Sequence, residues 1–409
     1  MENIFKEPDL SSQEVVQNPY PHYEAIKSID PIYKSETIFN GCWLIFDYED
    51  IIYFLKDTTF VSSKRERYLI DALPIEEQNK FDELIKIHSQ WYVHYDPPEH
   101  TRIRKIMGRG FSKKVLQKLE IEISDHIETI LNKLDPYSTL DITEEISKHV
   151  PLLTITALLG VDLGDVSKLS EWIDGIAAYM GAEKPNLKVI ENAQNAIISF
   201  RTYFEKVLDE RAKNTEDDDM LSLLIAAHEK EDNLTRDELF AQCSLVAFAG
   251  NETTKNLIST TLYLLLNEPG LKEEVMDNKK LIPQLIDESL RYENPVQFVN
   301  RIVKQDYTYK GHEFKKGDYI AVMLGAGNRD EKVFTAPDEF NIHRNEGPHL
   351  SFGPGIHSCI GQVLAKMEAK LTLNLLLDKY PEIQLAEKSF WRNNPGLRGL
   401  KTVNVKLNP

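Results

Sequence analysis

The chain has 409 residues, of which 42% are hydrophobic and 28% charged, so it can build a large core. Its formal net charge of −17 argues against a general binder of nucleic acid or of an anionic membrane, because both would repel it. The first thirty residues hold no apolar segment typical of an export signal or a membrane anchor, which predicts a cytoplasmic protein.

Short strands are expected near the N-terminus. Residues 20–60 combine a short helix with two alternating apolar runs, 31–35 and 42–48, on either side of Asn40-Gly41. An Asn-Gly pair between such runs is a strong hairpin signal, so a small sheet is expected to start here.

A long helix is predicted in the middle of the chain. Thr235 and Glu238 form a capping box, and the apolar-rich segment after them continues to about Leu266. At 1.5 Å per residue this helix is about 48 Å long, so it must cross the whole protein. The pattern from Glu99 onward is otherwise almost wholly helical, with breaks at Asp135-Pro136, Gly160, residues 184–186 and the acidic residues 214–220.

The C-terminal third mixes helices with short strands. A helix holds residues 288–295, strands are expected at 298–303 and 319–324, and a helix near 360–380 precedes a closing strand pair. Neither an internal repeat nor a linker-like boundary is visible. This predicts a single domain over residues 1–409, mainly α with a small β region.

The cysteines point to a reduced compartment. Cys42, Cys243 and Cys359 are odd in number and too widely spaced for a zinc ribbon or a disulfide framework. Cys42 alternates with apolar neighbours and Cys243 lies in a helical stretch, so both are interpreted as small buried hydrophobes. Only Cys359 has unusual neighbours.

Cys359 lies in the loop "SFGPGIHSCIG", residues 351–361. It could be a packed thiol in a turn, but glycines here allow a close approach to a flat ligand, and Gly361 opens a helix whose N–H groups favour a thiolate. No other Cys or clustered His stands nearby to complete a zinc site, so the remaining ligands of a bound metal must come from a cofactor. Haem iron fits, with four porphyrin nitrogens, one sulfur and one open position.

The loop resembles the haem-binding signature of the cytochromes P450, F-G-x-G-x-H-x-C-x-G, and further motifs follow the order of the soluble bacterial members. The resemblance implies a triangular, helix-rich prism. Haem b (iron protoporphyrin IX) would be clamped between the long central helix and the helix after the cysteine loop, with Cys359 as the metal ligand. The matching positions are Phe352, Gly353, Gly355, His357, Cys359 and Gly361.

The segment "AGNETT", residues 249–254, resembles the oxygen-activating motif of this family. Gly250 would let the helix pass close to the iron, and Glu252 with Thr253 would offer an acid beside a hydroxyl for proton delivery. The plainer interpretation is an exposed Glu followed by threonines that lower helix propensity.

Glu288 and Arg291 lie at i and i+3, so they share one helix face. Such a pair is usually a surface ion pair of small value. The resemblance implies instead the buried E-x-x-R pair that supports the cysteine loop. Its customary third partner is an arginine whose place Glu339 takes, which leaves Arg344 or Arg329 as substitutes.

Four cations match residues that hold the haem propionates in the family. The segment "DPPEHTRIR" contains His100 and Arg104, one helical turn apart, and Arg301 and His357 complete the set. Taken singly, each is more simply a surface charge or a satisfied histidine. Further cofactor contacts implied by the resemblance are Phe352, Gly353, Gly361 and Ala249.

The substrate is expected above the haem. Leu245, Phe248 and Ala249 share one helical face, and Val296 and Val299 would face them from the other side. The alternative for Phe248 is simple core packing. The ring at this position predicts a narrow space that suits a slender or flat part of the substrate.

The resemblance implies a monooxygenase that inserts one atom of O₂ into a C–H bond or double bond of a small to medium-sized apolar molecule. The substrate would be free or bound to a carrier protein. The reaction would belong to secondary-metabolite biosynthesis, for example of a polyketide, peptide or terpenoid. Electrons would come from a separate ferredoxin and its reductase. Basic residues suited to an acidic ferredoxin are Arg102, Arg104, Lys105, Arg109, Lys113 and Lys114, although an ordinary exposed helix face would show the same pattern. The alternatives are a peroxide-driven fatty-acid hydroxylase and a non-catalytic haem-thiolate gas sensor, and the Glu252–Thr253 pair argues against both.

Overall fold

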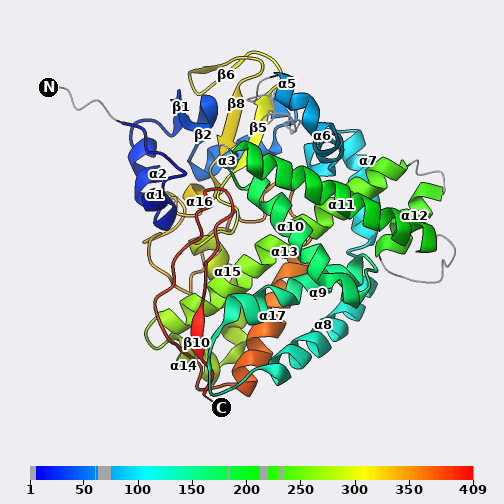
Figure 1. The fold of residues 1–409 in the computed structure, drawn as a ribbon. Coiled ribbons are helices and arrows are strands. Elements are labelled where there is room, and N and C mark those ends of the chain that lie inside the picture. The colour runs from blue at the N-terminus through cyan, green and yellow to red at the C-terminus, as the bar shows by residue number, and fades with distance from the viewer. Residues whose placement is uncertain are drawn as a thin grey trace.

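The computed structural model describes residues 6–59, 61–62, 75–182, 185–211, 220–229 and 234–408. Helices dominate, and the strands form small sheets at two ends of the molecule (Figure 1). The predicted fold class, mainly α with a small β region, is therefore confirmed. Of the predicted breaks, Lys184 and residues 214–219 lie outside the described residues.

The largest sheet has the strand order β1-β2-β8-β5-β3. β1 and β2 are antiparallel, with Ser35 opposite Cys42, which confirms the hairpin predicted around Asn40-Gly41. β2 runs parallel to β8, so the N-terminal hairpin joins strands from the C-terminal third. The strands are β1 (Ile32–Ser35), β2 (Cys42–Ile45), β3 (Val61–Ser62), β5 (Val299–Val303) and β8 (Tyr319–Val322).

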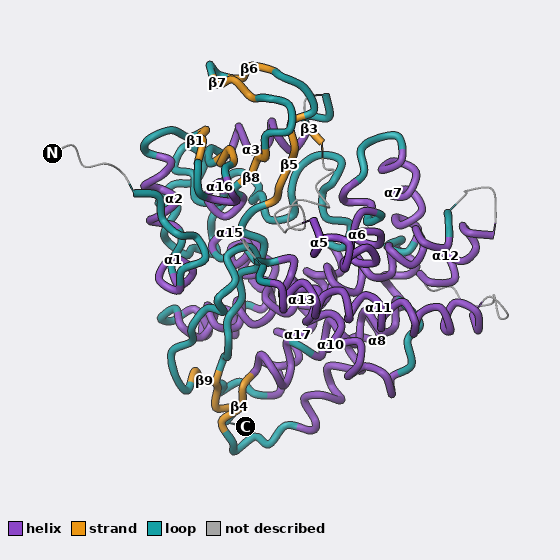
Figure 2. The backbone as a smooth tube through the Cα atoms, turned by 45° about the horizontal axis from the view of Figure 1, so that its top comes forward, coloured by secondary structure: helices purple, strands orange, loops and turns teal. Residues whose placement is uncertain are grey.

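Two smaller sheets complete the β structure (Figure 2). β9 (Gln384–Leu385) and β10 (Asn404–Lys406) form the expected closing antiparallel pair, and β10 also pairs with β4 (Thr139–Asp141). β6 (Tyr307–Tyr309) and β7 (His312–Phe314) form a hairpin of their own. The C-terminal strand is therefore paired with the segment between α8 and α9.

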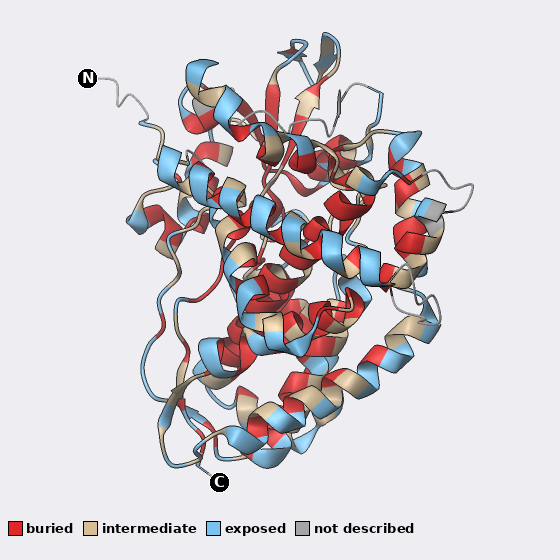
Figure 3. Cartoon of the chain, turned by 45° about the vertical axis from the view of Figure 1, so that its right-hand side comes forward, coloured by how far each residue is buried: buried red, intermediate tan, exposed pale blue. Residues whose placement is uncertain are grey.

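The helices on the outside of the molecule are amphipathic. In α8, for example, Leu119, Ile123, Ile127 and Leu131 repeat every four residues and are buried, while the opposite side is exposed (Figure 3). Within the described residues, no helix has the length and apolar character needed to cross a membrane. The helices before α13 are α1 (Gln13–Gln17), α2 (Tyr20–Lys27), α3 (Tyr48–Lys56), α5 (Ile75–Gln78), α6 (Asp82–Ser89), α7 (Glu99–Arg109), α8 (Lys113–Lys133), α9 (His149–Leu158), α10 (Val166–Met180), α11 (Leu187–Arg211) and α12 (Met220–Glu229).

The predicted long helix is α13 (Arg236–Asn267), and the capping box of Thr235 and Glu238 opens it. It is buried on nearly all sides and packs against α9, α10, α15 and α17, as expected for a helix through the centre of a large domain. Cys243 of this helix and Cys42 of β2 are both buried, which confirms their interpretation. The helices after α13 are α14 (Leu271–Asp277), α15 (Ile282–Tyr292), α16 (Leu324–Gly327) and α17 (Gln362–Lys379).

Candidate active site

A large cavity lies between α13 and the loop that carries Cys359. It holds about 1910 Å³ of empty space, counting its open mouth. Its walls come mainly from α9, α13, the segment around β5 and the start of α17, and most of the lining side chains are apolar. Cys359 and Thr253, far apart in sequence, both face this space.

The loop before α17 presents the Cys359 thiol to the cavity. Gly353 and Gly355 have φ values of +66° and +88°, in the left-handed region that favours glycine. A Cβ at residue 355 would also lie 2.6 Å from the carbonyl oxygen of Leu55. The Cys359 amide donates to the Phe352 carbonyl at 2.8 Å, which closes the turn. The glycines therefore let the loop turn tightly beneath a thiol that opens into the cavity.

The electrostatics of the Cys359 thiol differ from the sequence prediction. Burial, the strongest influence, raises its pKa, while the Gly361 N–H and Arg104 lower it without outweighing burial. Gly361 is the N-cap of α17, so the helix N-terminus acts in the predicted direction but does not produce a thiolate alone. Coordination to a metal ion would produce the thiolate, because a metal ion deprotonates a thiol that binds to it.

The α13 segment opposite the thiol carries Ala249, Gly250 and Thr253, which all line the cavity. The Thr253 hydroxyl donates to the Ala249 carbonyl at 2.7 Å. A Cβ on Gly250 would lie 2.5 Å from Cδ1 of Ile155 in α9. The missing side chain thus makes room for α9 to pack against α13, a role that the sequence did not predict.

Glu252 is absent from the cavity wall and lies in a buried charged cluster on another side of α13. Lys255 Nζ lies 2.6 Å from Oε2, and Arg392 forms an ion pair with Oε1. Burial is the largest influence and raises the pKa of Glu252, but the two cations outweigh it, so the pKa is lowered. The predicted acid–hydroxyl pair is therefore adjacent in sequence but divided between two environments.

The four predicted cations gather at one edge of the cavity. Arg301 and His357 line it, and the His100 and His357 rings lie 4.3 Å apart between centroids. Arg104 donates to the hydroxyl of Tyr92, itself a lining residue, at 3.2 Å. The fold therefore brings together residues from three separate segments, as the sequence predicted.

His100 is buried, yet among the described residues neither ring nitrogen has a hydrogen-bond partner of normal geometry. Burial and then Arg104 lower its pKa, and Asp96 and the Ile356 backbone oppose them. The neutral ring is favoured, and it retains an N–H that can be donated to an acceptor. A carboxylate at this edge of the cavity would supply that acceptor.

All five predicted substrate contacts, Leu245, Phe248, Ala249, Val296 and Val299, line the cavity. Phe248 is almost fully buried, and its ring stacks on Trp91 at 5.5 Å between centroids. Phe248 is therefore both a wall of the cavity and a packed core residue.

The sequence did not predict several residues of the site. Lys255 stands at i+3 from Glu252, a spacing that could have revealed the ion pair. Arg392 and Leu397 come from a distant loop and carry no local signal. Glu368 of α17 also lines the cavity; its side chain is buried and its Oε2 has no hydrogen-bond partner within the described part of the chain.

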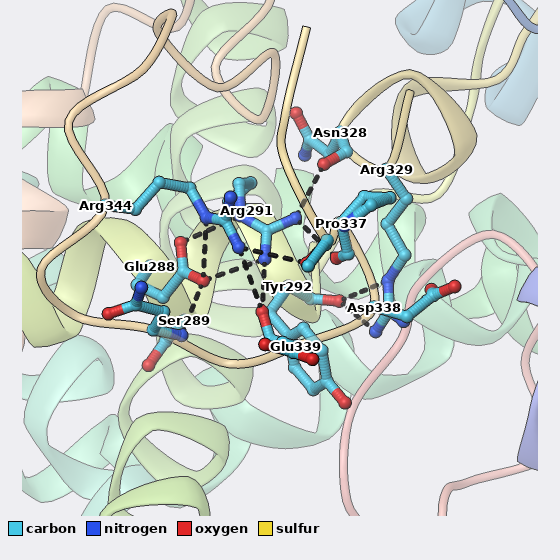
Figure 4. Close-up of polar contacts among 12 residues, drawn as sticks. Glu288, Ser289, Arg291, Tyr292, Asn328, Arg329, Pro337, Asp338, Glu339 and Arg344 are labelled. Carbon is cyan, nitrogen blue, oxygen red and sulfur yellow. Dashed lines mark hydrogen bonds and ion pairs between the residues drawn. The ribbon is translucent and has the colours of Figure 1, made fainter. Parts of the chain in front are cut away.

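Glu288 and Arg291 form the predicted buried pair (Figure 4). Arg291 Nε and Nη2 donate to the two carboxylate oxygens at 2.8 and 2.7 Å. Arg344 is the third partner, with its Nε 3.4 Å from Glu288 Oε1. Arg329 instead donates to Asp338 and to the Tyr292 carbonyl, both at 2.8 Å.

This network reaches the cysteine loop through Asn328. Arg291 Nη1 donates to the Asn328 carbonyl at 3.0 Å, and the Asn328 amide group donates to Ser351 Oγ at 2.8 Å. Ser351 Oγ in turn donates to the Leu290 carbonyl of α15 at 2.7 Å. The start of the loop is thereby fixed to the helix that carries the ion pair.

Comparison with known proteins identifies this arrangement. The family model described as Cytochrome P450 matches residues 77–396. The chain belongs to the cytochrome P450 family. Its enzymes are monooxygenases that hold the iron of haem b through a cysteine thiolate.

This P450 is similar over almost its full length to bacterial members. It is 30% identical to the biotin biosynthesis cytochrome P450 of Bacillus subtilis, over 97% of this chain and 98% of the relative. It is also 30% identical to the polyketide biosynthesis cytochrome P450 PksS of the same species, over 97% of each. The crystal structure of P450BioI with an acyl carrier protein bearing hexadec-9Z-enoic acid superposes with a TM-score of 0.89 at 29% identity, covering 97% of this chain and 100% of that one.

The residues of this P450 fit haem b. Among the described residues no group of three or more His, Cys, Asp or Glu could hold a metal ion, so the other iron ligands must come with the porphyrin. Cys359 offers a single sulfur to the cavity, and the cationic edge with its unsatisfied His100 suits the two propionates. The apolar walls suit the porphyrin ring.

Proposed function

We propose that this P450 inserts one atom of O₂ into a C–H bond or double bond of a small to medium-sized apolar molecule, in secondary-metabolite biosynthesis. The observation that carries the proposal is the shared cavity, with the Cys359 thiol and the Thr253 hydroxyl facing one mainly apolar space. Bound haem supplies the chemistry, the reductive activation of O₂ and the transfer of one oxygen atom.

The chain binds and orients the cofactor through residues of both walls. Cys359 would ligate the iron, and Arg104, Arg301, His357 and the neutral ring of His100 would donate hydrogen bonds to the propionates. The pair of Glu288 and Arg291 keeps the cysteine loop in place through Asn328. The remaining proposed contacts with the porphyrin are Phe352, Gly353, Gly361 and Ala249.

Protons enter the cavity through Thr253. Its hydroxyl donates to the Ala249 carbonyl at rest, so its oxygen can accept a proton from one side while its own proton moves to the reacting oxygen. Glu252, in the charged cluster on another side of the helix, is the proposed source of that proton once it has itself taken one up. Apolar side chains, including Leu245 and Phe248, hold the substrate and exclude bulk water.

Two features suggest the class of substrate. The cavity walls are mainly apolar, and Val296, Val299 and Phe248 all line the space. One structural neighbour holds a fatty acyl chain on a carrier protein, and one relative is assigned to polyketide biosynthesis. We therefore propose that the substrate of the present chain is an apolar, acyl-like or polyketide-like molecule, either free or attached to a carrier protein.

Electrons are proposed to come from a separate ferredoxin and its reductase in the cytoplasm. Lys105, Arg109, Lys113 and Lys114 are exposed around the end of α7 and the start of α8, where an acidic ferredoxin could bind. Arg102 forms an ion pair with Glu238, and Arg104 donates a hydrogen bond to the Tyr92 hydroxyl. We also propose that residues 1–409 act as one domain.

Two measurements test the function. The dithionite-reduced protein under carbon monoxide should show the long-wavelength Soret band of a thiolate-ligated haem; Cys359→His should lose it, while Cys42→Ala and Cys243→Ala keep it. Screening a library of apolar compounds with NADPH and surrogate redox partners should yield an oxygenated product. Turnover with hydrogen peroxide alone would indicate a peroxide-driven hydroxylase, and haem binding without turnover a gas sensor.

A further inference from the structure

One loop near the C-terminus touches both the cavity and the buried acid of α13. This segment, residues 390–400, is called the C-terminal loop below. Gly396 and Leu397 line the cavity, whereas Arg392 donates to Glu252. The cavity wall and the ion pair therefore belong to one short piece of chain.

The C-terminal loop is closed by its own hydrogen bonds. The Arg392 amide donates to the Gly399 carbonyl at 2.9 Å, and Asn394 Oδ1 accepts from the Leu397 amide at 2.8 Å. Leu397 also pairs with Val296, another lining residue. Leu397 and Arg392 are therefore connected through the hydrogen bonds of one loop.

The two cations on Glu252 differ in their access to water. Lys255, on Oε2, has a side chain only 7% exposed, whereas that of Arg392, on Oε1, is 31% exposed. Arg392 can therefore leave the carboxylate for solvent, which Lys255 cannot do. Its Nε is also buried without a hydrogen-bond partner in the described structure, so the guanidinium is incompletely held.

The contact between Arg392 and α13 is closely built. Arg392 also donates to Asn256 Oδ1 at 2.5 Å, and Gly399 leaves the space for this contact, since a Cβ there would lie 2.2 Å from the same oxygen. A small shift of the C-terminal loop would therefore disturb the ion pair.

We propose that Arg392 is a positioning residue that links occupancy of the cavity to protonation of Glu252: a substrate pressing on Leu397 shifts the C-terminal loop and draws Arg392 off the carboxylate. The inference rests on the proton-supplying role proposed for Glu252. Removing Arg392 takes away one of the two cations that lower the pKa of Glu252, so the pKa rises although Lys255 stays in contact, and Glu252 takes a proton from water more readily. The acid is thus loaded when substrate is bound.

Other charges face the same cluster and stay in place during this step. Asp174 of α10 interacts electrostatically with Glu252, Lys255 and Arg392, and Lys148 acts on Asp174 from the residue preceding α9. Lys255 keeps its contact with Glu252. The only proposed change is therefore the position of Arg392.

The first test measures the protonation of Glu252 in haem-loaded protein by infrared difference spectroscopy. The probe is clotrimazole, a bulky aromatic azole, added until its Soret shift saturates. The wild type should gain a protonated-carboxyl band that Glu252→Gln lacks. Arg392→Gln should show the band without the probe, and Arg392→Lys should restore the wild-type response. A wild-type spectrum without any probe-dependent carboxyl band overturns the proposal.

The second test separates the loop from the loss of charge. Arg392→Gln and the matched control Lys255→Met each remove one cation from Glu252, but only the first releases the C-terminal loop. Amide hydrogen exchange in residues 390–400 should be about tenfold faster in Arg392→Gln and unchanged in Lys255→Met. Equal exchange in both variants contradicts the link. Unchanged product per NADPH in Thr253→Ala would instead refute the proposed proton route. The infrared and hydrogen-exchange measurements would still test the link between Arg392 and Glu252 in that case.

Discussion

Glu368 provides a quantitative test of the electrostatics inside the site. Burial raises the pKa of its carboxyl to about 8 from an ordinary value of 4.5, and Thr154 opposes this only in part. A carboxyl with a higher pKa in the folded chain than in the unfolded chain destabilises the fold as the pH rises between those two values. The contribution of Glu368 to the free energy of unfolding should therefore fall from about pH 4.5 and level off above about pH 8.

Glu368→Gln removes this titration while keeping the side-chain volume. Since one pKa unit corresponds to about 1.4 kcal/mol, the free energy of unfolding of the variant should rise relative to that of the wild type. Measured from their difference at low pH, the rise should be about 2 kcal/mol at pH 6 and about 4 kcal/mol at pH 8. The gain arises because a buried carboxylate must shed its hydration, whereas the neutral amide carries no charge.

Urea unfolding at a series of pH values between 5 and 9 measures the difference directly. Glu120→Gln, on the exposed side of α8, is the matched control and should show a difference from the wild type that does not vary with pH. A free-energy difference for Glu368→Gln that stays constant from pH 5 to pH 8 would show that the carboxyl is not held neutral in the fold.

Three further outcomes are expected. Thr253→Ala should still bind haem but divert reducing equivalents to peroxide, lowering product per NADPH by roughly tenfold or more; unchanged coupling would mean that another proton route dominates. Replacing Lys113 and Lys114 by Glu should raise the apparent KM for an acidic ferredoxin. Turnover of the wild type should fall as ionic strength rises, because salt screens the attraction between the two surfaces beyond about 8 to 10 Å. An unchanged KM and an unchanged turnover would place the docking surface elsewhere. Phe248→Ala should keep the carbon monoxide spectrum and shift substrate affinity or the position oxidised, at a stability cost below the ~3 to 5 kcal/mol of a fully enclosed Phe. Poor haem incorporation or a much lower melting temperature, with normal regioselectivity in the fraction that folds, would make the ring purely a packing partner of Trp91.

Several parts of the fold were readable from local pattern. The capping box of Thr235 and Glu238 opens α13 as predicted, because its hydrogen bonds join residues only three apart. The turn around Cys359 follows from glycines whose positive φ is accessible to few other residues. The E-x-x-R pair forms for the same kind of reason, since i and i+3 share a helix face.

Long-range packing decided the rest. Arg344 rather than Arg329 completes the Glu288 network, a choice made by how the segment after Phe340 folds back on α15. Gly250 serves the contact with Ile155 of α9, which no motif could reveal.

The electrostatic state of the site belongs wholly to the tertiary structure. Sequence proximity to a helix N-terminus predicted a thiolate at Cys359, but desolvation by the surrounding walls outweighs that local effect in the chain alone. Glu252 is adjacent to Thr253 in sequence, yet its partner Arg392 is 140 residues away. Motifs are encoded by neighbours along the chain, whereas the pKa of a buried group depends on which charges and how little water the completed fold places around it.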